Sequence, residues 1–136
     1  MENKEEITEF LQREFPQFTY KIESVGERTA VIRHRTSEDD LRPGGTVSGP
    51  TLFGLADAGL YVAILAELGI IALAVTTNVT INFLRKPSAD ADVIAKCKLI
   101  KVGKTLVVGE VNLYSDGDDE PIAHAVGTYS IPPRKS

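Results

Sequence analysis

The feature that most constrains this chain is an apolar segment near its middle, with the sequence SGPTLFGLADAGLYVAILAELG. Between Thr51 and Ala66 its single charged side chain is Asp57. The segment predicts a long central helix over about residues 50–68, because serine caps helices and proline fits a first helical turn, with Gly69 as the expected end. A helix that is apolar on nearly every face has to be buried on nearly every face.

The rest of the chain predicts a sheet for this helix to cover. A short amphipathic helix over residues 4–15 comes first, and residues 36–50 form a long loop rich in turn residues. Consecutive strands with short turns indicate an antiparallel sheet and a single α+β domain over residues 1–136. The predicted strands are residues 20–25, 29–35, 74–84, 92–102, 105–115 and 121–131.

The first strand after the central helix alternates between apolar and polar side chains, which is typical of a strand with one buried face. The residues expected on its apolar face are Val75, Thr77, Val79, Ile81 and Phe83. The residues expected on the opposite face are Thr76, Asn78, Thr80 and Asn82.

One sheet covers only part of a helix that is apolar all round, so a second copy of the chain is the simplest cover for the rest. Gly54 and Gly59 each cost roughly 1 kcal/mol relative to alanine inside a helix. Close approach of a second backbone would explain them. Tight packing of the helix on its own sheet explains them equally well.

The composition limits the classes of protein to which the chain can belong. With 136 residues, 43% hydrophobic and 25% charged, it has the balance of a soluble globular domain. The net charge of −4 argues against a nucleic-acid partner. Asp57, Glu67 and three glycines interrupt the apolar run, which argues against a membrane span. A charged N-terminus and the single Cys97, which has no disulfide partner, predict a cytoplasmic location.

Asp57 itself has two explanations. Burying an unpaired carboxylate costs several kcal/mol, so this side chain needs hydrogen-bond donors or a chemical task. A structural acid tied to the backbone or to a threonine hydroxyl is one explanation. A functional acid is the other, because buried ionisable groups collect at active sites.

The order and spacing of three segments resemble the hotdog-fold acyl-CoA thioesterases, and among them the PaaI-like (phenylacetate-pathway) branch. These segments are GTVSGPTLFGLADAGLYVA, VTTNVTINFLRKP and IKVGKTLVVGEV, within a match over roughly residues 20–132. The resemblance implies an antiparallel sheet wrapped around one central helix, and hydrolysis of an acyl-CoA substrate to a free acid and CoA with no metal or redox cofactor. It also implies that Asp57 is the catalytic base or nucleophile, that the Gly49 N–H polarises the carbonyl, and that the Thr76 hydroxyl orients the attacking water.

The spacing of two of these residues predicts an oligomer. Gly49 and Asp57 are separated by about 12 Å along a helix axis, at about 1.5 Å per residue. One carbonyl carbon cannot lie within hydrogen-bond reach of both groups on one helix. We therefore expect Gly49 of one subunit to meet Asp57 of another across a twofold axis, in a homodimer or in a homotetramer built from dimers.

Three positions depart from the pattern of the family. Ser48 and Pro50 stand where the family has a histidine and a second glycine, and Arg42 stands where relatives often carry an asparagine that binds the thioester oxygen. Pro50 removes one amide donor from the start of the helix, whereas the Gly49 amide stays available. Ser48 and Arg42 are expected to contact the substrate, as is Asn78 on the following strand.

Further substrate contacts are expected from the central helix and from strand ends. Phe53 and Tyr61 are expected to line the acyl tunnel, with core packing as the alternative. Basic residues near turns are expected to bind the phosphates of CoA, with plain surface solvation as an equally good alternative. These residues are Arg85, Lys86, Lys101 and Lys104.

Two other functions stay open on the sequence. An enoyl-CoA hydratase of the same fold needs Asp and His in one motif near the helix start, but no histidine lies between His34 and His124. A non-catalytic acyl-CoA-binding or structural dimer is favoured by the loss of the loop histidine and opposed by the retained Asp57. The two histidines have no partner at metal-ligand spacing, so no metal site is expected.

Overall fold

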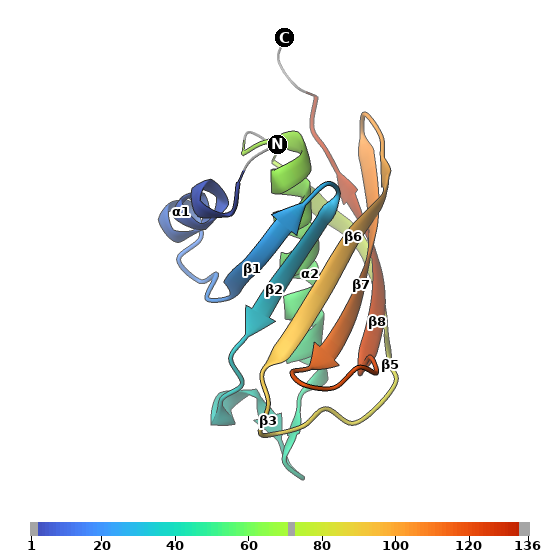
Figure 1. The fold of residues 1–136 in the computed structure, drawn as a ribbon. Helices are drawn as coiled ribbons and strands as arrows, with labels where there is room; N and C mark the ends of the chain where they lie inside the picture. Colours follow the sequence, from blue (N-terminus) through green and yellow to red (C-terminus); the bar gives the residue numbers. More distant parts are fainter. Residues whose placement is uncertain (1–2, 71–72, 134–136) are drawn as a thin grey trace.

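The fold is a six-stranded antiparallel sheet packed on one long helix, α2 (Gly49–Leu68), as seen in the computed structural model, which describes residues 3–70 and 73–133 (Figure 1). The strands of this sheet are β1 (Lys21–Gly26), β2 (Thr29–His34), β5 (Val75–Phe83), β6 (Val93–Val102), β7 (Leu106–Ser115) and β8 (Ala123–Ser130). Their order across the sheet is β1-β2-β6-β7-β8-β5. The predicted α+β fold, with an antiparallel sheet around one central helix, is confirmed.

The two ends of α2 follow from local sequence chemistry. Ser48 is the N-cap, and its hydroxyl accepts a hydrogen bond from the N–H of Thr51 at 3.4 Å. Pro50 occupies the first turn, where a missing N–H costs nothing. Gly69 ends the helix with a φ of 99°, a conformation that favours glycine. By length and composition alone α2 is apolar enough to cross a membrane, a test that the core helix of a globular fold also passes.

The core lies between α2 and the facing side of the sheet. Alternate residues of β6, including Ala95, Cys97 and Leu99, are buried against the helix. A Cβ at Gly59 would overlap the sulfur of Cys97, so packing on the chain's own sheet accounts for this glycine. A Cβ at Gly54 would meet only the Tyr20 hydroxyl, at an ordinary 3.4 Å, so the single chain leaves room there.

The N-terminal helix α1 (Lys4–Glu14) packs against β1 and α2 at one edge of the fold (Figure 1). Its first turn is capped by Asn3, whose side chain accepts the N–H of Glu6 at 2.9 Å. Ile7 and Leu11, one helical turn apart, are fully buried.

The segment before α2 is more regular than predicted. In place of one long loop it contains a short 3-10 turn, η1 (Glu38–Asp40), and two paired strands, β3 (Leu41–Arg42) and β4 (Thr46–Val47). Gly44 and Gly45 make the turn between them with φ values of 101° and 76°. Strands of two residues are too short to show alternation, which is why the sequence pattern indicated only a loop.

Candidate active site

Asp57 lies near the middle of α2, half-buried, at the border of a cavity of about 510 Å³. Residues of α1, α2, β5 and the segments before β1 and β5 line this Asp57 cavity, together with one residue of β8. They are Leu11, Phe15, Gln17, Phe18, Tyr20, Gly54, Asp57, Ala58, Tyr61, Leu73, Ala74, Val75, Thr76 and Tyr129. Among these lining residues Asp57 is the only one with a carboxylate or a basic side chain. The carboxylate is therefore set in mainly apolar surroundings.

Thr76 reaches Asp57 because β5 contains a β-bulge. Strand pairing with β8 jumps from Thr76 opposite Tyr129 to Asn78 opposite Thr128, so Thr77 is an extra residue. Beyond the bulge the alternation is shifted by one, which turns Thr76 toward α2. Its hydroxyl donates to Asp57 Oδ1 at 2.8 Å. The predicted facing of Thr76, away from the core, and of Thr77, toward it, is therefore wrong.

Tyr129 of β8 is a site residue that the sequence analysis missed. It is 2% exposed, and its hydroxyl donates a hydrogen bond to Asp57 Oδ1 while lying 2.6 Å from the Asp57 main-chain oxygen. Burial and the hydrogen bond to Asp57 raise the pKa of the phenol well above its ordinary value. The signal available in the sequence was a tyrosine on a core-facing position, since a buried phenol needs an acceptor and Asp57 needs donors.

Two other tyrosines border the Asp57 cavity. Tyr61, predicted to contact the substrate, lines it from α2 and packs edge-on against Phe15 at 5.9 Å between ring centres. Burial raises the pKa of Tyr61, and burial followed by the charges of Asp40 and Asp57 raises that of Tyr20. Both phenols therefore stay neutral at ordinary pH.

The first turn of α2 borders a different, smaller cavity of about 250 Å³. Gly49 lines it together with Arg42, Phe83, Arg85 and Lys86. The Gly49 N–H has no hydrogen-bond acceptor among the residues that the structure describes. In one chain Gly49 and Asp57 thus lie on separate cavities, which agrees with the distance expected from their spacing.

Ser48 takes part in a polar network at this end of α2. Its hydroxyl lies 3.0 Å from that of Thr51, which donates to Asp40 Oδ1 at 3.4 Å. His34 Nε2 lies 2.8 Å from Asp40 Oδ2 and forms an ion pair when protonated. Burial raises the pKa of Asp40, but hydrogen bonds from Ser37 and the contact with His34 outweigh it and lower the pKa below its ordinary value. The Ser48 hydroxyl is therefore engaged in holding the loop and the helix start.

The remaining predicted contacts are dispersed. Phe53 is 40% exposed on α2 and is absent from the lining of the Asp57 cavity. Asn78 is exposed on β5. Their predicted roles in substrate binding stay predictions.

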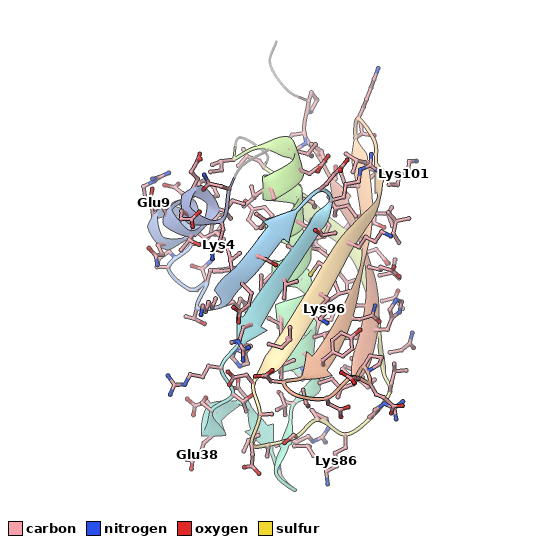
Figure 2. The ribbon with its side chains drawn as sticks, viewed as in Figure 1. Lys4, Glu9, Glu38, Lys86, Lys96 and Lys101 are labelled. Carbon is pink, nitrogen blue, oxygen red and sulfur yellow. The ribbon has the colours of Figure 1, made fainter. Side chains whose placement is uncertain are left out.

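The basic residues do not form one cluster in a single chain. Lys86 and Lys101 lie at opposite ends of the molecule (Figure 2). Lys101 lies near the end of β6, and Lys104 lies in the turn between β6 and β7. Arg85 pairs with Glu120 at 3.0 Å and donates to the main-chain oxygen of Pro121 at 3.2 Å.

The histidines and the cysteine lie outside the Asp57 cavity. His124 contacts Glu110 at 3.2 Å on β7, and His34 contacts Asp40. Cys97 is 3% exposed, and burial raises the pKa of its thiol to about 12, so it is not a nucleophile at ordinary pH. Within residues 3–70 and 73–133 there is no group of three or more His, Cys, Asp or Glu side chains placed to hold a metal ion.

Comparison with solved structures places this geometry among known folds. A protein from Silicibacter sp. TM1040, provisionally described as a thioesterase, is 43% identical and covers 96% of this chain and 92% of its own, with a TM-score of 0.89. A hypothetical thioesterase from Streptococcus pneumoniae, solved with coenzyme A, is 21% identical, with coverages of 88% and 93% and a TM-score of 0.76. The phenylacetic acid degradation protein PaaI from Thermus thermophilus is 22% identical, with coverages of 90% and 97% and a TM-score of 0.73. The last two show likeness of fold alone.

Comparison of the sequence with protein families gives a matching result. The model of the thioesterase superfamily matches residues 44–122, more than half of the chain and the part that contains α2, β5, β6 and β7. A comparison with curated protein sequences found no match. On the family match and the 43% identity to the Silicibacter protein, the chain belongs to the thioesterase superfamily, as its sequence predicted.

Proposed function

We propose that this protein is a homo-oligomeric hydrolase that cleaves an acyl-CoA thioester into a free acid and CoA, with Asp57 as general base or nucleophile. The observation that carries the proposal is Asp57 itself, a carboxylate in a mainly apolar cavity with the Thr76 hydroxyl 2.8 Å from its Oδ1. Ionisable groups placed in such clefts are candidates for chemistry. The coenzyme A bound to the pneumococcal relative supports a CoA thioester as the substrate.

Both roles of Asp57 lead to the same products. As a base, the carboxylate takes a proton from a water whose oxygen bonds to the carbonyl carbon; the C–S bond then breaks and the proton passes to the departing CoA sulfur. As a nucleophile, a carboxylate oxygen bonds to the carbonyl carbon and releases the CoA thiolate. Water then hydrolyses the resulting anhydride to the free acid and restores the carboxylate.

Exposed apolar surface supports a second copy of the chain as part of the site. β5 pairs only with β8 among the described strands, so its other edge is free. Val75 and Phe83, at its two ends, are 62% and 55% exposed. A long edge strand with exposed apolar residues is a template for pairing with another strand. We therefore propose that β5 pairs with the partner's β5.

Antiparallel pairing of two β5 strands about their middle would also complete the site. It would set the start of one strand, where Thr76 binds Asp57, against the end of the other, where Phe83 packs on Gly49. The partner subunit's Gly49 N–H would then point toward a carbonyl held at Asp57. Donors at a helix N-terminus stabilise the oxyanion that forms when a carbonyl is attacked.

The same pairing would bring basic residues from both chains toward one corner. Lys104 lies at the end of the sheet where β5 begins, because Leu106 and Val75 are both paired with Ser130 of β8. The partner's Arg85 and the partner's Lys86, which follow its β5, would approach that end. We assign them, with Lys104 and with the partner's Arg42, which lines the same cavity as Arg85 and Lys86, to the phosphates of CoA.

One observation favours the alternative, a non-catalytic acyl-CoA-binding dimer. Ser48 occupies the position of the family's loop histidine, and its hydroxyl is engaged with Thr51 and the helix N-terminus. The first turn of α2 thus lacks a titrating group of that kind. Turnover separates this alternative from the proposed enzyme.

The test is release of free thiol from short, long and aryl acyl-CoAs by the wild type, by Asp57→Asn and by a control, Asp119→Asn, in the exposed turn after β7. We expect kcat to fall by about 10²-fold or more in Asp57→Asn, the usual effect of losing a general base or nucleophile, and to be unchanged in the control. Activity that survives in Asp57→Asn would exclude this site. Saturable acyl-CoA binding without any turnover would favour the binding dimer.

A further inference from the structure

The two oxygens of the Asp57 carboxylate differ in their surroundings. Oδ1 accepts hydrogen bonds from the Thr76 hydroxyl, at 2.8 Å, and from the Tyr129 phenol. Oδ2 has no hydrogen-bond donor among residues 3–70 and 73–133. A carboxylate held in this way has one oxygen fixed to the protein and one left for a ligand or a water.

The two donors are neighbours in the sheet. Thr76 and Tyr129 face each other across β5 and β8, and both side chains reach the same oxygen of α2. The strands that carry them are held differently. The strand of Thr76, β5, is at the edge of the sheet, whereas the strand of Tyr129, β8, is paired on both sides, with β7 and β5. Tyr129 is also buried, whereas Thr76 is exposed in the single chain. The phenol is therefore the more rigid of the two supports.

The phenol has to act as a donor in this contact. Its oxygen lies close to Oδ1 and to the Asp57 main-chain oxygen, and neither of these can donate a hydrogen to it when Asp57 is ionised. Burial and the contact with Asp57 both raise the pKa of Tyr129, so the proton stays on the phenol throughout the ordinary pH range. A donor of this kind favours the ionised carboxylate and fixes its orientation.

We propose that Tyr129 is a positioning residue for the hydrolysis proposed above: together with Thr76 it holds Oδ1, so that Oδ2 is the oxygen that meets the attacking water or the thioester carbonyl. The inference rests on the proposed function of Asp57. It adds which of the two carboxylate oxygens reacts, and it names Tyr129 as the residue that keeps the other oxygen bound.

The surroundings of Asp57 allow a clean pH test. Within the described part of the chain, the titratable groups that face it or its phenol partner are Tyr129 on β8, Tyr61 on α2, Tyr20 before β1 and Cys97 on β6. Burial raises the pKa of each, first among the causes in every case, so all four stay neutral throughout the acid range. The acid limb of the pH-rate profile then reports the carboxylate itself.

The experiment compares the wild type with Tyr129→Phe, which removes only the hydroxyl. The matched control is Tyr114→Phe on the opposite face of the sheet, where the ring lies 4.8 Å from the Lys96 ammonium. In Tyr129→Phe we expect kcat to fall about 10- to 100-fold, the effect of losing one hydrogen bond to a charged group, with KM changed less than about twofold. We also expect the acid limb of the kcat/KM profile to move to higher pH, since the carboxylate is easier to protonate without its donor. The control should match the wild type.

A merely structural role for Tyr129 would lower the melting temperature and leave the position of the acid limb unchanged. That result, or an unchanged kcat in a folded variant, overturns the inference. If Asp57→Asn abolishes activity while Tyr129→Phe behaves as the wild type, the proposed function stands and only the inference fails. If Asp57→Asn retains activity, the proposed function itself fails.

A second variant covers the case in which Tyr129→Phe does not fold. Replacing Tyr129 by 3-fluorotyrosine keeps the ring and the hydroxyl and makes the phenol a stronger donor, so the acid limb should move to lower pH. A readout without turnover is the carbon-13 signal of the Asp57 carboxyl group, whose titration midpoint should move in the same direction. An acid limb and a midpoint that both stay in place would overturn the inference.

Discussion

Asp57 and Gly49, which border two different cavities along α2, differ in how many of their hydrogen-bond partners a single chain supplies. At Asp57 the carboxylate already has two donors, Thr76 and Tyr129, from two neighbouring strands. At Gly49 the N–H has no acceptor in the described part of the chain, and Phe83, which packs on it, is 55% exposed. The difference teaches that one chain is sufficient to hold the acid, whereas under the proposed function the N–H that polarises the carbonyl comes from a second chain.

The sharpest test of this comparison is complementation between two inactive variants. Gly49→Pro removes the N–H at a helix position that tolerates proline, and Ser48 before it already has an extended backbone, with φ −72° and ψ 153°. Alone, Gly49→Pro should lose about 10²- to 10³-fold in kcat, the usual effect of removing an oxyanion donor. Asp57→Asn should lose as much or more.

Mixing the two variants after reversible unfolding should restore activity. Random pairing gives about half heterodimers, and each heterodimer has one intact site of two, so about one quarter of the wild-type activity should return in a twofold dimer. The measurement is thiol release from the refolded mixture, with each variant refolded alone as the control. No recovery would mean that each site lies within one chain.

Thr76→Val tests the hydrogen bonds that a single chain makes to the Asp57 carboxylate. Valine keeps the shape and removes the donor to Oδ1, so we expect a roughly tenfold loss in kcat, less than from the variants above because Tyr129 still holds the oxygen. The control is Thr77→Val at the bulge, whose hydroxyl donates to the Thr128 main-chain oxygen instead, at 3.1 Å. A larger loss in Thr77→Val than in Thr76→Val would contradict the observed bulge.

The two glycines of α2 lie on different sides of the helix: Gly59 faces the sheet and Gly54 lines the Asp57 cavity. Gly59→Ala would overlap the Cys97 sulfur and should lower the free energy of unfolding by about 1–3 kcal/mol. At Gly54 there is room for a Cβ, and alanine is the better helix former. Gly54→Ala should therefore raise the free energy of unfolding by up to about 1 kcal/mol. Chemical denaturation measures both. Weaker self-association of Gly54→Ala in sedimentation would reveal close approach of a second chain there.

The smallest effect is expected from Asp40, which supports the loop next to Gly49. Its folded pKa lies below the ordinary 3.8, so its contribution to stability is present above about pH 4 and is lost as the pH falls through the folded value. Asp40→Asn should therefore lower Tm at pH 7 by a few degrees, on the order expected for one contact, and lower it less at pH 3. An equal drop at both pH values would exclude a charge-dependent role.

Much of the fold was predictable because it follows from periodicity and local chemistry. The apolar run with its cap and its terminal glycine predicted α2, and alternation predicted the strands of the sheet. The site was predictable only in part. Asp57 is conspicuous as the one charge in an apolar helix, but its contact with Thr76 depends on a bulge, and one inserted residue in the pairing leaves no sign in the sequence.

Tyr129 escaped prediction for a different reason. Its partner lies 72 positions away in the chain, and a tyrosine among alternating core residues has the same pattern whether it serves packing or a hydrogen bond. The basic residues differ again. One whole strand, β6, separates Arg85 from Lys104, so the predicted strand order already places the two residues at opposite ends of the sheet in one chain.

The apolar character of α2 also has a consequence for protein synthesis. The strands β6, β7 and β8 pack on α2 and all follow it in the chain, so the helix leaves the ribosome on the order of several seconds before this part of its cover exists. In that interval an 18-residue window of α2 with a mean hydropathy of 1.5 is open to insertion into a lipid bilayer. An aspartate at the centre of a helix opposes such insertion by about 2.5–3.5 kcal/mol. Asp57 therefore disfavours insertion of the nascent helix into a bilayer before its sheet has formed.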